Sequence, residues 1–249
     1  MHRFYQSSSR INDAGFTLDE RESHHAINVL RVRKGDRVVV LDGAGSEFMC
    51  EVSSLEKKAV ALDVRNQSRT EPLPYRITLL QAMTKGKSMD FIIQKATELC
   101  VHRIVPLAAG RSVVQLEDVN SKLAKWNAIA IDSIKQCGSP WLPIIESPVT
   151  PKEFLDRNEH FDLPVVASLQ SHIQHPRKYV DDYRSEHGAL PKTIGVWIGP
   201  EGDFTPSEAN SVLTAGVHPI SLGQVILRSE TAALYAVSVL NYEMQSPRD

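Results

Sequence analysis

Two stretches decide the fold of this chain: Ile198-Gly199-Pro200-Glu201-Gly202-Asp203-Phe204-Thr205-Pro206-Ser207-Glu208 and Leu222-Gly223-Gln224-Val225-Ile226-Leu227-Arg228-Ser229-Glu230-Thr231-Ala232. Each stretch runs from an apolar strand through a tight loop into a helix. Because the two transitions lie close together in the sequence, their loops can meet at one edge of a sheet. Ligands of open α/β sheets bind at the carboxyl ends of the strands, where such loops gather. We therefore expect the function of the chain to reside here.

The residues around these loops predict the elements that hold them. Residues 193–198 are rich in β-branched and aromatic side chains and predict a buried strand. Thr205-Pro206-Ser207-Glu208 is a capping box with proline at the first helical position, and Gly216 suits the carboxyl end of that helix. Residues 218–222 predict a short strand. Ser229 can cap a closing helix that runs from about Glu230 to Met244.

Strands and helices also alternate through the rest of the chain after residue 75. Strands are expected at 76–81, 103–107 and 164–169, and helices at 88–101 and 121–137. The apolar positions expected to face inward are Met89, Ile92, Ile93, Ala96, Leu99 and Cys100 in the first helix and Leu123, Trp126, Ala130 and Ile134 in the second. This alternation predicts a mostly parallel α/β sheet.

The first 72 residues have a different pattern, rich in short strands. Strands are expected at 37–41, 48–52 and 59–64, with a hairpin at Asp42-Gly43-Ala44-Gly45, and Ser23 can cap a helix from His24 to Leu30. We interpret this as a small β-barrel with one helix. Glu71-Pro72-Leu73-Pro74 suits neither a helix nor a central strand, so we place a linker there and expect two domains, 1–72 and 73–249.

Composition indicates an ordinary globular protein. Hydrophobic residues make up 42% of the chain, yet no run of about 18 apolar residues predicts a membrane span and the amino terminus lacks the apolar core of a signal peptide. Cys50, Cys100 and Cys137 are odd in number and lack CxxC spacing. We therefore expect free thiols in a reduced, cytoplasmic setting.

Charge alone does not point to nucleic acid. The chain has 28 Lys and Arg against 30 Asp and Glu, a net charge of −2. The nearest basic cluster is Arg31, Arg33, Lys34 and Arg37, which on composition alone is better interpreted as a solvated turn.

Several common sites are excluded by their missing spacing. No GxGxxG follows the strand at 76–81, and Lys85-Gly86-Lys87-Ser88 lacks the upstream glycine of a P-loop. His172 and His175 have no Cys or acidic partner at ligand spacing, so no metal is expected. A single glycine most often serves a turn, but Gly199, Gly202 and Gly223 in two converging loops favour a cradle in which backbone groups recognise a ligand.

The two stretches, GPEGxF and LGxxILRxETA, closely resemble the carboxyl-terminal motifs of the SPOUT methyltransferases, a trefoil-knot class that uses S-adenosyl-L-methionine. Within that class they look like the family that forms 3-methyluridine in 16S ribosomal RNA of the small subunit. The similarity continues over nearly the whole chain, in Arg3-Phe4, residues 24–31, 84–90 with 92–99, and Arg111-Ser112-Val113. Two departures are Asp203, where the family usually has glycine or another small residue, and Ser139-Pro140, where an arginine is expected.

The resemblance implies an α/β trefoil-knot methyltransferase domain preceded by a PUA-like, RNA-binding barrel, and a homodimer that acts without a metal. The closing helix has an apolar stripe that could pack across the dimer interface or within the chain: Leu234, Val237, Leu240 and Met244. It implies methyl transfer to N3 of a uridine in small-subunit ribosomal RNA or the assembled particle. The cofactor residues that it implies are Ile198, Gly199, Gly202, Leu222, Gly223, Ile226, Leu227, Thr231 and Ala232. The RNA-binding residues are Arg3, Arg31, Arg33, Lys85 and Lys87.

Arg228 is the first catalytic candidate, since its fixed donors could hold a phosphate or the uracil oxygens and stabilise the uridine anion. A surface ion pair with Glu230 is the competing interpretation. Glu201 and Glu230 are further candidates, more suited to orienting the loops than to removing a proton. Two other functions stay open: a relative acting on another nucleotide, such as a transfer-RNA ribose, and a non-catalytic RNA-binding protein with a degenerate knot, which Asp203 would suit.

Overall fold

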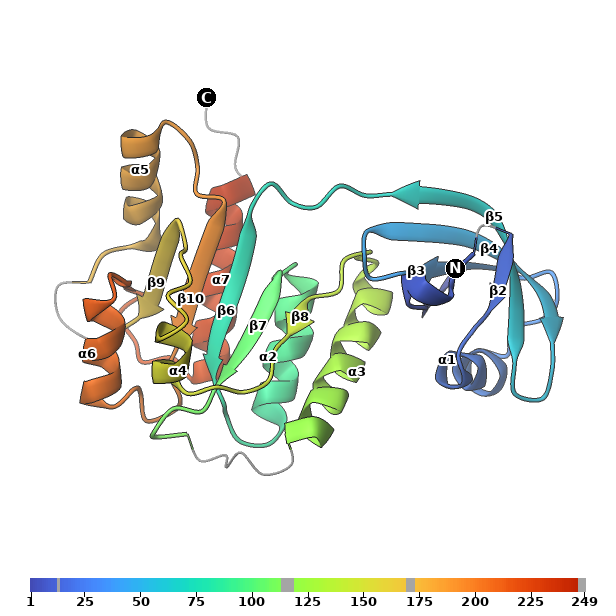
Figure 1. Cartoon of the computed structure of the whole chain (residues 1–249), viewed down its shortest axis with the longest axis horizontal. Helices are drawn as coiled ribbons and strands as arrows, with labels where there is room; N and C mark the ends of the chain where they lie inside the picture. The colour runs from blue at the N-terminus through green and yellow to red at the C-terminus, as the bar shows by residue number, and fades with distance from the viewer. Residues whose placement is uncertain (13, 113–118, 169–172, 246–249) are drawn as a thin grey trace. The chain divides into compact units, whose positions relative to one another are not determined.

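We describe the protein from a computed structural model, which covers residues 1–12, 14–112, 119–168 and 173–245 (Figure 1). The chain forms two compact units, one of Met1–Pro72 with Ile131–Leu142 and one of Leu73–Ala130 with Pro143–Asp249. We call them the N-terminal and C-terminal units. The segment Ile131–Leu142 belongs to the N-terminal unit because Ile134 and Leu142 pack with Val39 and Leu41. The sequence pattern did not predict that residues 131–142 pack with the N-terminal unit.

The N-terminal unit is built on a five-stranded sheet of order β1-β3-β4-β5-β2. The strands are β1 (His2–Tyr5), β2 (Gly15–Thr17), β3 (Arg37–Leu41), β4 (Ser46–Leu55) and β5 (Val60–Arg69). β1 runs parallel to β3 and the other pairs are antiparallel. All five strands contribute to one core, with Phe4, Phe16 and Phe48 among its buried residues. The three predicted strands and the hairpin between β3 and β4 are confirmed, while β1 and β2 were not predicted.

The helix of this unit begins earlier than the sequence suggested. α1 spans Glu20–His24 and is capped by Asp19, whose carboxylate accepts a hydrogen bond from the Glu22 N–H at 2.8 Å. Ser23 is buried inside the helix, and its hydroxyl donates to the Leu18 carbonyl. Residues His25–Val29 continue as a π-helical turn. The predicted cap at Ser23 was therefore wrong, because Asp19 satisfies the first free N–H groups instead.

The C-terminal unit contains a six-stranded sheet of order β11-β9-β10-β6-β7-β8, parallel throughout. Its strands are β6 (Arg76–Ala82), β7 (Arg103–Leu107), β8 (Ile144–Ile145), β9 (Leu163–Ala167), β10 (Thr193–Ile198) and β11 (His218–Ile220). Gln81 near the end of β6 lies beside Ile198 at the end of β10. The predicted parallel sheet is confirmed, and the loops after β6, β7, β9, β10 and β11 leave from one edge.

Six helices accompany this sheet within the described residues: α2 (Lys87–Glu98), α3 (Val119–Cys137), α4 (Pro151–Leu155), α5 (Pro176–His187), α6 (Pro206–Thr214) and α7 (Ser229–Gln245). α4 and α6 lie over one face, where Phe154 and Val212 join a core with Leu80 and Trp197 (Figure 1). α7 contacts α2, α5 and the strands β6 and β10. The threading that would make a trefoil knot stays a prediction from the family resemblance.

Helix ends show where the sequence analysis succeeded and failed. The capping box of Thr205 and Glu208 is formed as predicted, and Gly216 follows α6 with a φ of +84°. α2 ends at Glu98, so Cys100 is not part of its inward stripe: it is exposed and left-handed, with a φ of +58°. α4 and α5 were not predicted, although Thr150 and Glu153 form a second capping box that was readable in the sequence.

The closing helix α7 is mostly internal. Val237, Leu240 and Met244 from its predicted stripe are at most 7% exposed within the chain itself. Their apolar side chains therefore complete the core of the C-terminal unit rather than a surface. Among the helices that the structure describes, none is long and apolar enough to cross a membrane.

Candidate cofactor pocket and active site

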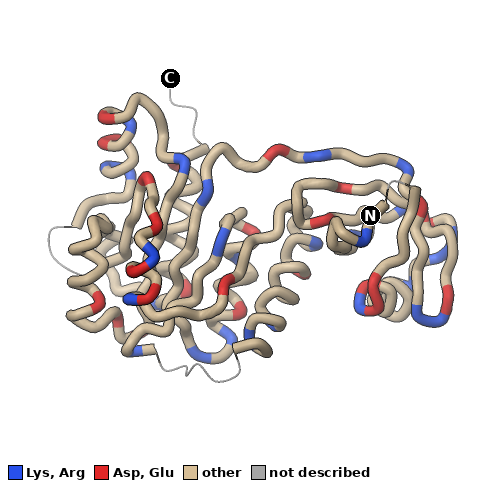
Figure 2. The backbone as a smooth tube through the Cα atoms, in the orientation of Figure 1, with Lys and Arg blue, Asp and Glu red and all other residues tan. Residues whose placement is uncertain are grey.

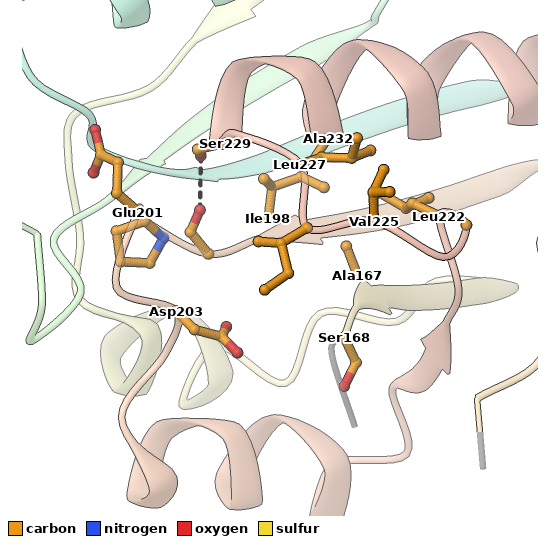
Figure 3. Close-up of a pocket in the computed structure, with 14 residues that line it drawn as sticks. Ala167, Ser168, Ile198, Glu201, Asp203, Leu222, Val225, Leu227, Ser229 and Ala232 are labelled. Atoms are coloured by element: carbon orange, nitrogen blue, oxygen red, sulfur yellow. Dashed lines mark hydrogen bonds between the residues drawn. The ribbon is translucent and has the colours of Figure 1, made fainter. Parts of the chain in front are cut away.

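A pocket opens at the carboxyl edge of the parallel sheet, where the loops after β9, β10 and β11 meet the first turn of α7 (Figure 3). This is where parallel α/β sheets bind ligands. Its cavity volume is about 90 Å³, so a ligand of nucleoside size would extend through its open side. The lining residues are Ala167, Ser168, Ile198, Gly199, Pro200, Glu201, Asp203, Leu222, Gly223, Val225, Ile226, Leu227, Ser229 and Ala232.

The first loop is held in a tight turn by Asp203. Its N–H donates to the Pro200 carbonyl at 2.9 Å, and its carboxylate accepts from the Phe204 N–H at 2.7 Å. The backbone of Asp203 is left-handed, with a φ of +60°, a conformation that favours glycine and that Asp tolerates better than most residues. The unusual residue at this position is thus compatible with the turn. Gly199 leaves room for this carboxylate, because a Cβ there would lie 2.9 Å from the Asp203 Oδ1 and would force the side chain to shift.

A chain of hydrogen bonds joins three elements at the pocket floor. The Gln81 amide donates to the Ser229 hydroxyl at 2.9 Å, and that hydroxyl donates to the Gly199 carbonyl at 2.7 Å, the dashed bond of Figure 3. Gln81 and Ser229 are both buried. The end of β6, the start of α7 and the end of β10 are therefore fixed relative to one another. Among the described residues, the Gln81 Oε1 atom has no hydrogen-bond partner.

The second loop, residues 221–228, presents free backbone groups to the pocket. Within the described part of the chain, the N–H groups of Leu222 and residues 224–227 donate no hydrogen bond. The Ser221 N–H donates to the Gln174 carbonyl at 2.9 Å, and the Gly223 N–H donates to the Ser221 hydroxyl at 3.2 Å. Gly223 has a φ of +111°, and a Cβ there would meet no atom within 4 Å. The loop thus combines unpaired donors with open space at a glycine, which fits a ligand recognised through backbone contacts.

The walls beside this loop are apolar. Ile198 and Leu227 lie inside the pocket, while Val225 and Ile226 are 69% and 80% exposed at its mouth. Two neighbouring aliphatic side chains at this exposure suggest a contact surface for a ligand or another chain.

The structure brings together most of the residues predicted to bind the cofactor. Ile198, Gly199, Leu222, Gly223, Ile226, Leu227 and Ala232 all line the pocket. Gly202 and Thr231 do not: the Gly202 carbonyl accepts a hydrogen bond from the Arg111 guanidinium at 2.8 Å, and Thr231 is exposed in the first turn of α7. Their predicted contact with the cofactor stays a prediction.

The three catalytic candidates take different positions. Glu201 is exposed at the pocket wall, and Figure 3 shows its carboxylate directed away from the pocket centre. Arg228 is exposed directly between Leu227 and Ser229, which line the pocket, and it forms no ion pair with any described residue. The competing interpretation, a surface pair between Arg228 and Glu230, is therefore not what the structure has. Glu230 is half-buried and outside the lining.

The predicted RNA-binding residues are all exposed, and they are divided between the two units. In the C-terminal unit, Lys85 lies in the loop that follows β6 and Lys87 is the first residue of α2. Arg3, Arg31 and Arg33 belong to the N-terminal unit. Figure 2 shows basic and acidic residues interspersed along both units, in agreement with the balanced composition.

Some pocket residues were not predicted as site residues. Ser229 was interpreted only as a helix cap, and Ala167-Ser168, Pro200 and Val225 were not singled out. The small pair Ala167-Ser168 directly after a buried strand was the readable signal, because such positions lie at the binding edge. His175 caps α5 by accepting from the Arg177 N–H, while His172 and Val113 lie outside the described residues. No group of three or more possible metal ligands occurs among the residues that the structure describes.

Comparisons with known proteins agree with this geometry. The family described as RNA methyltransferase domain matches residues 71–241, and the RNA methyltransferase PUA domain matches residues 18–65. The chain is 32% identical to ribosomal RNA small subunit methyltransferase E of Bacillus subtilis, over 92% of this chain and 91% of that protein. With the protein of the same name from Aquifex aeolicus the identity is 30%, over 96% and 99%.

Solved structures extend the match to three dimensions. A ribosomal RNA small subunit methyltransferase E from Neisseria gonorrhoeae, bound to S-adenosyl methionine, aligns with a TM-score of 0.84 and 29% identity over 96% of each chain. A methyltransferase from Legionella pneumophila, in complex with the bound cofactor SAM, aligns with a TM-score of 0.87 and 30% identity over 96% of each chain. Together with the parallel sheet and its looped pocket, these matches establish that the chain belongs to the RNA methyltransferase family, as its two loop motifs predicted.

Proposed function

We propose that the protein transfers a methyl group from S-adenosyl-L-methionine to N3 of a uridine in 16S ribosomal RNA. The observation that carries the cofactor assignment is the second loop, where unpaired backbone N–H groups surround a glycine whose absent Cβ leaves open space. Relatives named ribosomal RNA small subunit methyltransferase E, one of them solved with S-adenosyl methionine, support the choice of cofactor and RNA.

The residues of the chain divide the work between binding and charge stabilisation. The loop backbone at 222–227 and the wall of Ile198 and Leu227 would hold the cofactor, which supplies an electrophilic methyl group when bound. Positioning the uridine N3 in line can supply roughly 7–11 kcal/mol of barrier reduction at the limit. Before transfer, N3 would lose its proton to solvent water at the open side of the pocket, which leaves a uridine anion that accepts the methyl group. Arg228, exposed and unpaired beside the pocket, would stabilise the resulting negative charge on a uracil oxygen.

Asp203 no longer favours a non-catalytic protein. Its left-handed backbone and its bond to the Phe204 N–H show that it supports the loop in place of a glycine. The N3 atom lies on the Watson–Crick edge, so the target uridine must be unpaired when it enters the site.

The proposal extends to assembly and to the two domains. Residues 1–72 would bind RNA and residues 73–249 would carry the chemistry, in the cytoplasm. We propose a homodimer, but not through the predicted stripe, since Val237, Leu240 and Met244 are buried within the chain. Tyr235 and Tyr242 on α7 and Phe91 on the neighbouring α2 are 45%, 71% and 42% exposed and support a second copy as the partner.

The test is product mapping. Small subunits from a strain that lacks the gene are incubated with the purified protein and methyl-labelled cofactor, with naked 16S RNA in parallel, and nucleosides are identified by mass spectrometry. We expect 3-methyluridine at one position of 16S RNA. A methylated ribose, another methylated base, or no product despite cofactor binding would contradict the proposal.

A further inference from the structure

A second, larger pocket lies in the N-terminal unit, and nothing in the proposed methyl transfer uses it. It is bounded by β1, by α1 with the π-helical turn, and by the last turn of α3 that returns to this unit. Its cavity volume is about 590 Å³, within the range of roughly 300–1,000 Å³ typical of small-molecule sites. Arg3, Arg21, His24, His25, Val29 and Lys135 are among its lining residues.

The acidic groups of this pocket are already satisfied. Glu22 is 2% exposed, and its carboxylate accepts from Lys135 Nζ at 2.6 Å and from the Tyr5 N–H at 3.2 Å. Asp132 pairs with Arg21 at 2.9 Å and with Lys135 at 3.0 Å. These ion pairs line the bottom of the pocket and neutralise the charges of Arg21 and Lys135. They leave little repulsion toward an incoming anion.

Arg3 carries the remaining positive charge. Its guanidinium donates only to the carbonyls of Lys135 and Gln136, at 3.4 Å each, and within the described residues it has no carboxylate partner. Gly138 lies against it, since a Cβ there would be 3.0 Å from the Arg3 Cζ atom. Arg3 is thus held in place by weak contacts and retains free N–H donors. Its planar guanidinium is well suited to binding a phosphate through these donors.

The opposite wall is apolar and made by unusual backbone. The π-helical turn His25–Val29 closes with a bond from the Leu30 N–H to the His25 carbonyl at 3.0 Å, and Arg31 follows with a φ of +54°. Single π-helical turns and left-handed non-glycine residues concentrate at functional sites. This turn places Val29, 63% exposed, and the His24 and His25 rings along the pocket.

We infer that this pocket binds one unpaired nucleotide of the RNA substrate, with its phosphate at Arg3 and its base against Val29, Leu30 and the histidine rings. The inference rests on the proposed function, because it assumes an RNA substrate. Single-stranded RNA is recognised by bases splayed onto aromatic and apolar side chains combined with phosphate contacts. A duplex keeps its bases stacked and can reach only the charged rim.

The experiment measures binding of a fluorescein-labelled, single-stranded 12-nucleotide RNA of mixed sequence and of the same RNA annealed to its complement. The variants are Arg3→Ala and Val29→Asp. The matched control is Lys57→Ala, which removes an exposed charge from the same unit outside the pocket. We expect Arg3→Ala to weaken single-strand binding about tenfold, the size of one charge-assisted hydrogen bond. Val29→Asp should weaken single-strand binding but not duplex binding, and Lys57→Ala should change either by less than about twofold.

A second measurement covers variants that fail to fold. Single-stranded RNA containing 4-thiouridine is crosslinked to the wild-type protein, and we expect the adduct on peptides containing residues 21–30 or 132–136. Wild-type affinity in both folded variants, equal losses of single-strand and duplex binding in Val29→Asp, or crosslinks confined to peptides outside this pocket would overturn the inference. Cofactor binding by calorimetry and methylation are measured separately. A protein that binds RNA here but forms no 3-methyluridine refutes only the proposed reaction.

Discussion

At the scale of single residues, Arg228 offers the sharpest test of the reaction. Arg228→Ala should lower kcat about 10²–10³-fold while cofactor affinity is retained, because the donor acts where charge develops. Arg228→Lys should recover only part of the rate, since a point charge does not reproduce a planar fork. Single-turnover methylation at saturating RNA and calorimetry with the cofactor check both points. Arg177→Ala, which removes a surface ion pair with Asp181 on α5, is the control and should leave turnover intact. Wild-type turnover in Arg228→Ala would remove this residue from the mechanism.

Gly223 separates two reasons for a glycine. With a φ of +111° and open space around its absent Cβ, Gly223→Val should both strain the loop and project into the pocket, so cofactor binding is expected to be lost. Gly188→Val is a close control, because Gly188 also has a positive φ, +70°, and open space but ends α5 outside the pocket. It should cost stability and leave cofactor affinity unchanged. Calorimetry and thermal melting distinguish the two. Equal affinity in both folded variants would show that Gly223 serves only the turn.

Cys50 makes stability depend on alkaline pH. Burial, with a smaller contribution from Asp63, raises the pKa of the Cys50 thiol to about 11. Between about pH 9 and 11 the unfolded chain releases this proton and the folded chain keeps it. The free energy of unfolding should therefore fall with pH, by up to about 1.4 kcal/mol per pH unit from this group. Urea unfolding at pH 8 and pH 10 should show a smaller loss in Cys50→Ala than in the wild type and in Cys137→Ala, whose thiol is exposed. The same loss in all three would contradict the assignment.

The sequence identified residues whose role depends on local chemistry. Gly199, Gly223 and the capping pair of Thr205 and Glu208 follow from rules about short segments, and the structure has them in the predicted places. Ser229 was recognised as a helix start but not as the link between Gln81 and Gly199. That link joins residues 81, 199 and 229, which are far apart in the chain. A contact between such distant residues cannot be recognised from the pattern of a single sequence.

At the scale of elements, the start of α7 holds the edge of the sheet together. Ser229→Ala removes the hydroxyl that joins Gln81 to the Gly199 carbonyl, so the buried Gln81 amide keeps only its bond to the Ala82 carbonyl and the half-buried Gly199 carbonyl loses its partner. We expect a loss of about 1–3 kcal/mol in the free energy of unfolding and weaker cofactor binding, because the first loop loses its anchor. Ser238→Ala, exposed on the same helix, is the control for urea unfolding and calorimetry. Unchanged affinity in Ser229→Ala would show that the loop is fixed without this bond.

The strands and helices that were predicted share a strong period, and those that were missed do not. β6, β7, β10 and α2 carry continuous apolar runs or an inward stripe, while β1 and β2 are only four and three residues long. α5 is largely polar, with Pro176 and Val180 as its buried residues, so periodicity does not reveal it. Short elements and polar surface helices are fixed by the rest of the fold rather than by their own sequence.

At the scale of the whole molecule, the exposed aromatic residues of α2 and α7 lead to a prediction about assembly. Sedimentation should show a dimer at micromolar concentration. The double variant Tyr235→Asp with Tyr242→Asp should shift it to a monomer, since two charges would have to be buried in the interface. Ile144→Asp places a charge at another exposed apolar position of the same unit and should leave the dimer intact. An active wild-type monomer at that concentration would refute the proposed homodimer.

The return of Ile131–Leu142 to the N-terminal unit has a consequence for how this protein could be taken apart or have evolved. The first 72 residues do not form a self-contained domain, because Val39 and Leu41 of their sheet pack against Ile134 and Leu142. The ribosome adds these two residues only about 60–70 residues after residue 72. If residues 1–72 alone were fused to another enzyme, the apolar side chains of Val39 and Leu41 would be exposed to water. During synthesis, too, Val39 and Leu41 stay exposed until residues 131–142 have been made and can pack against them.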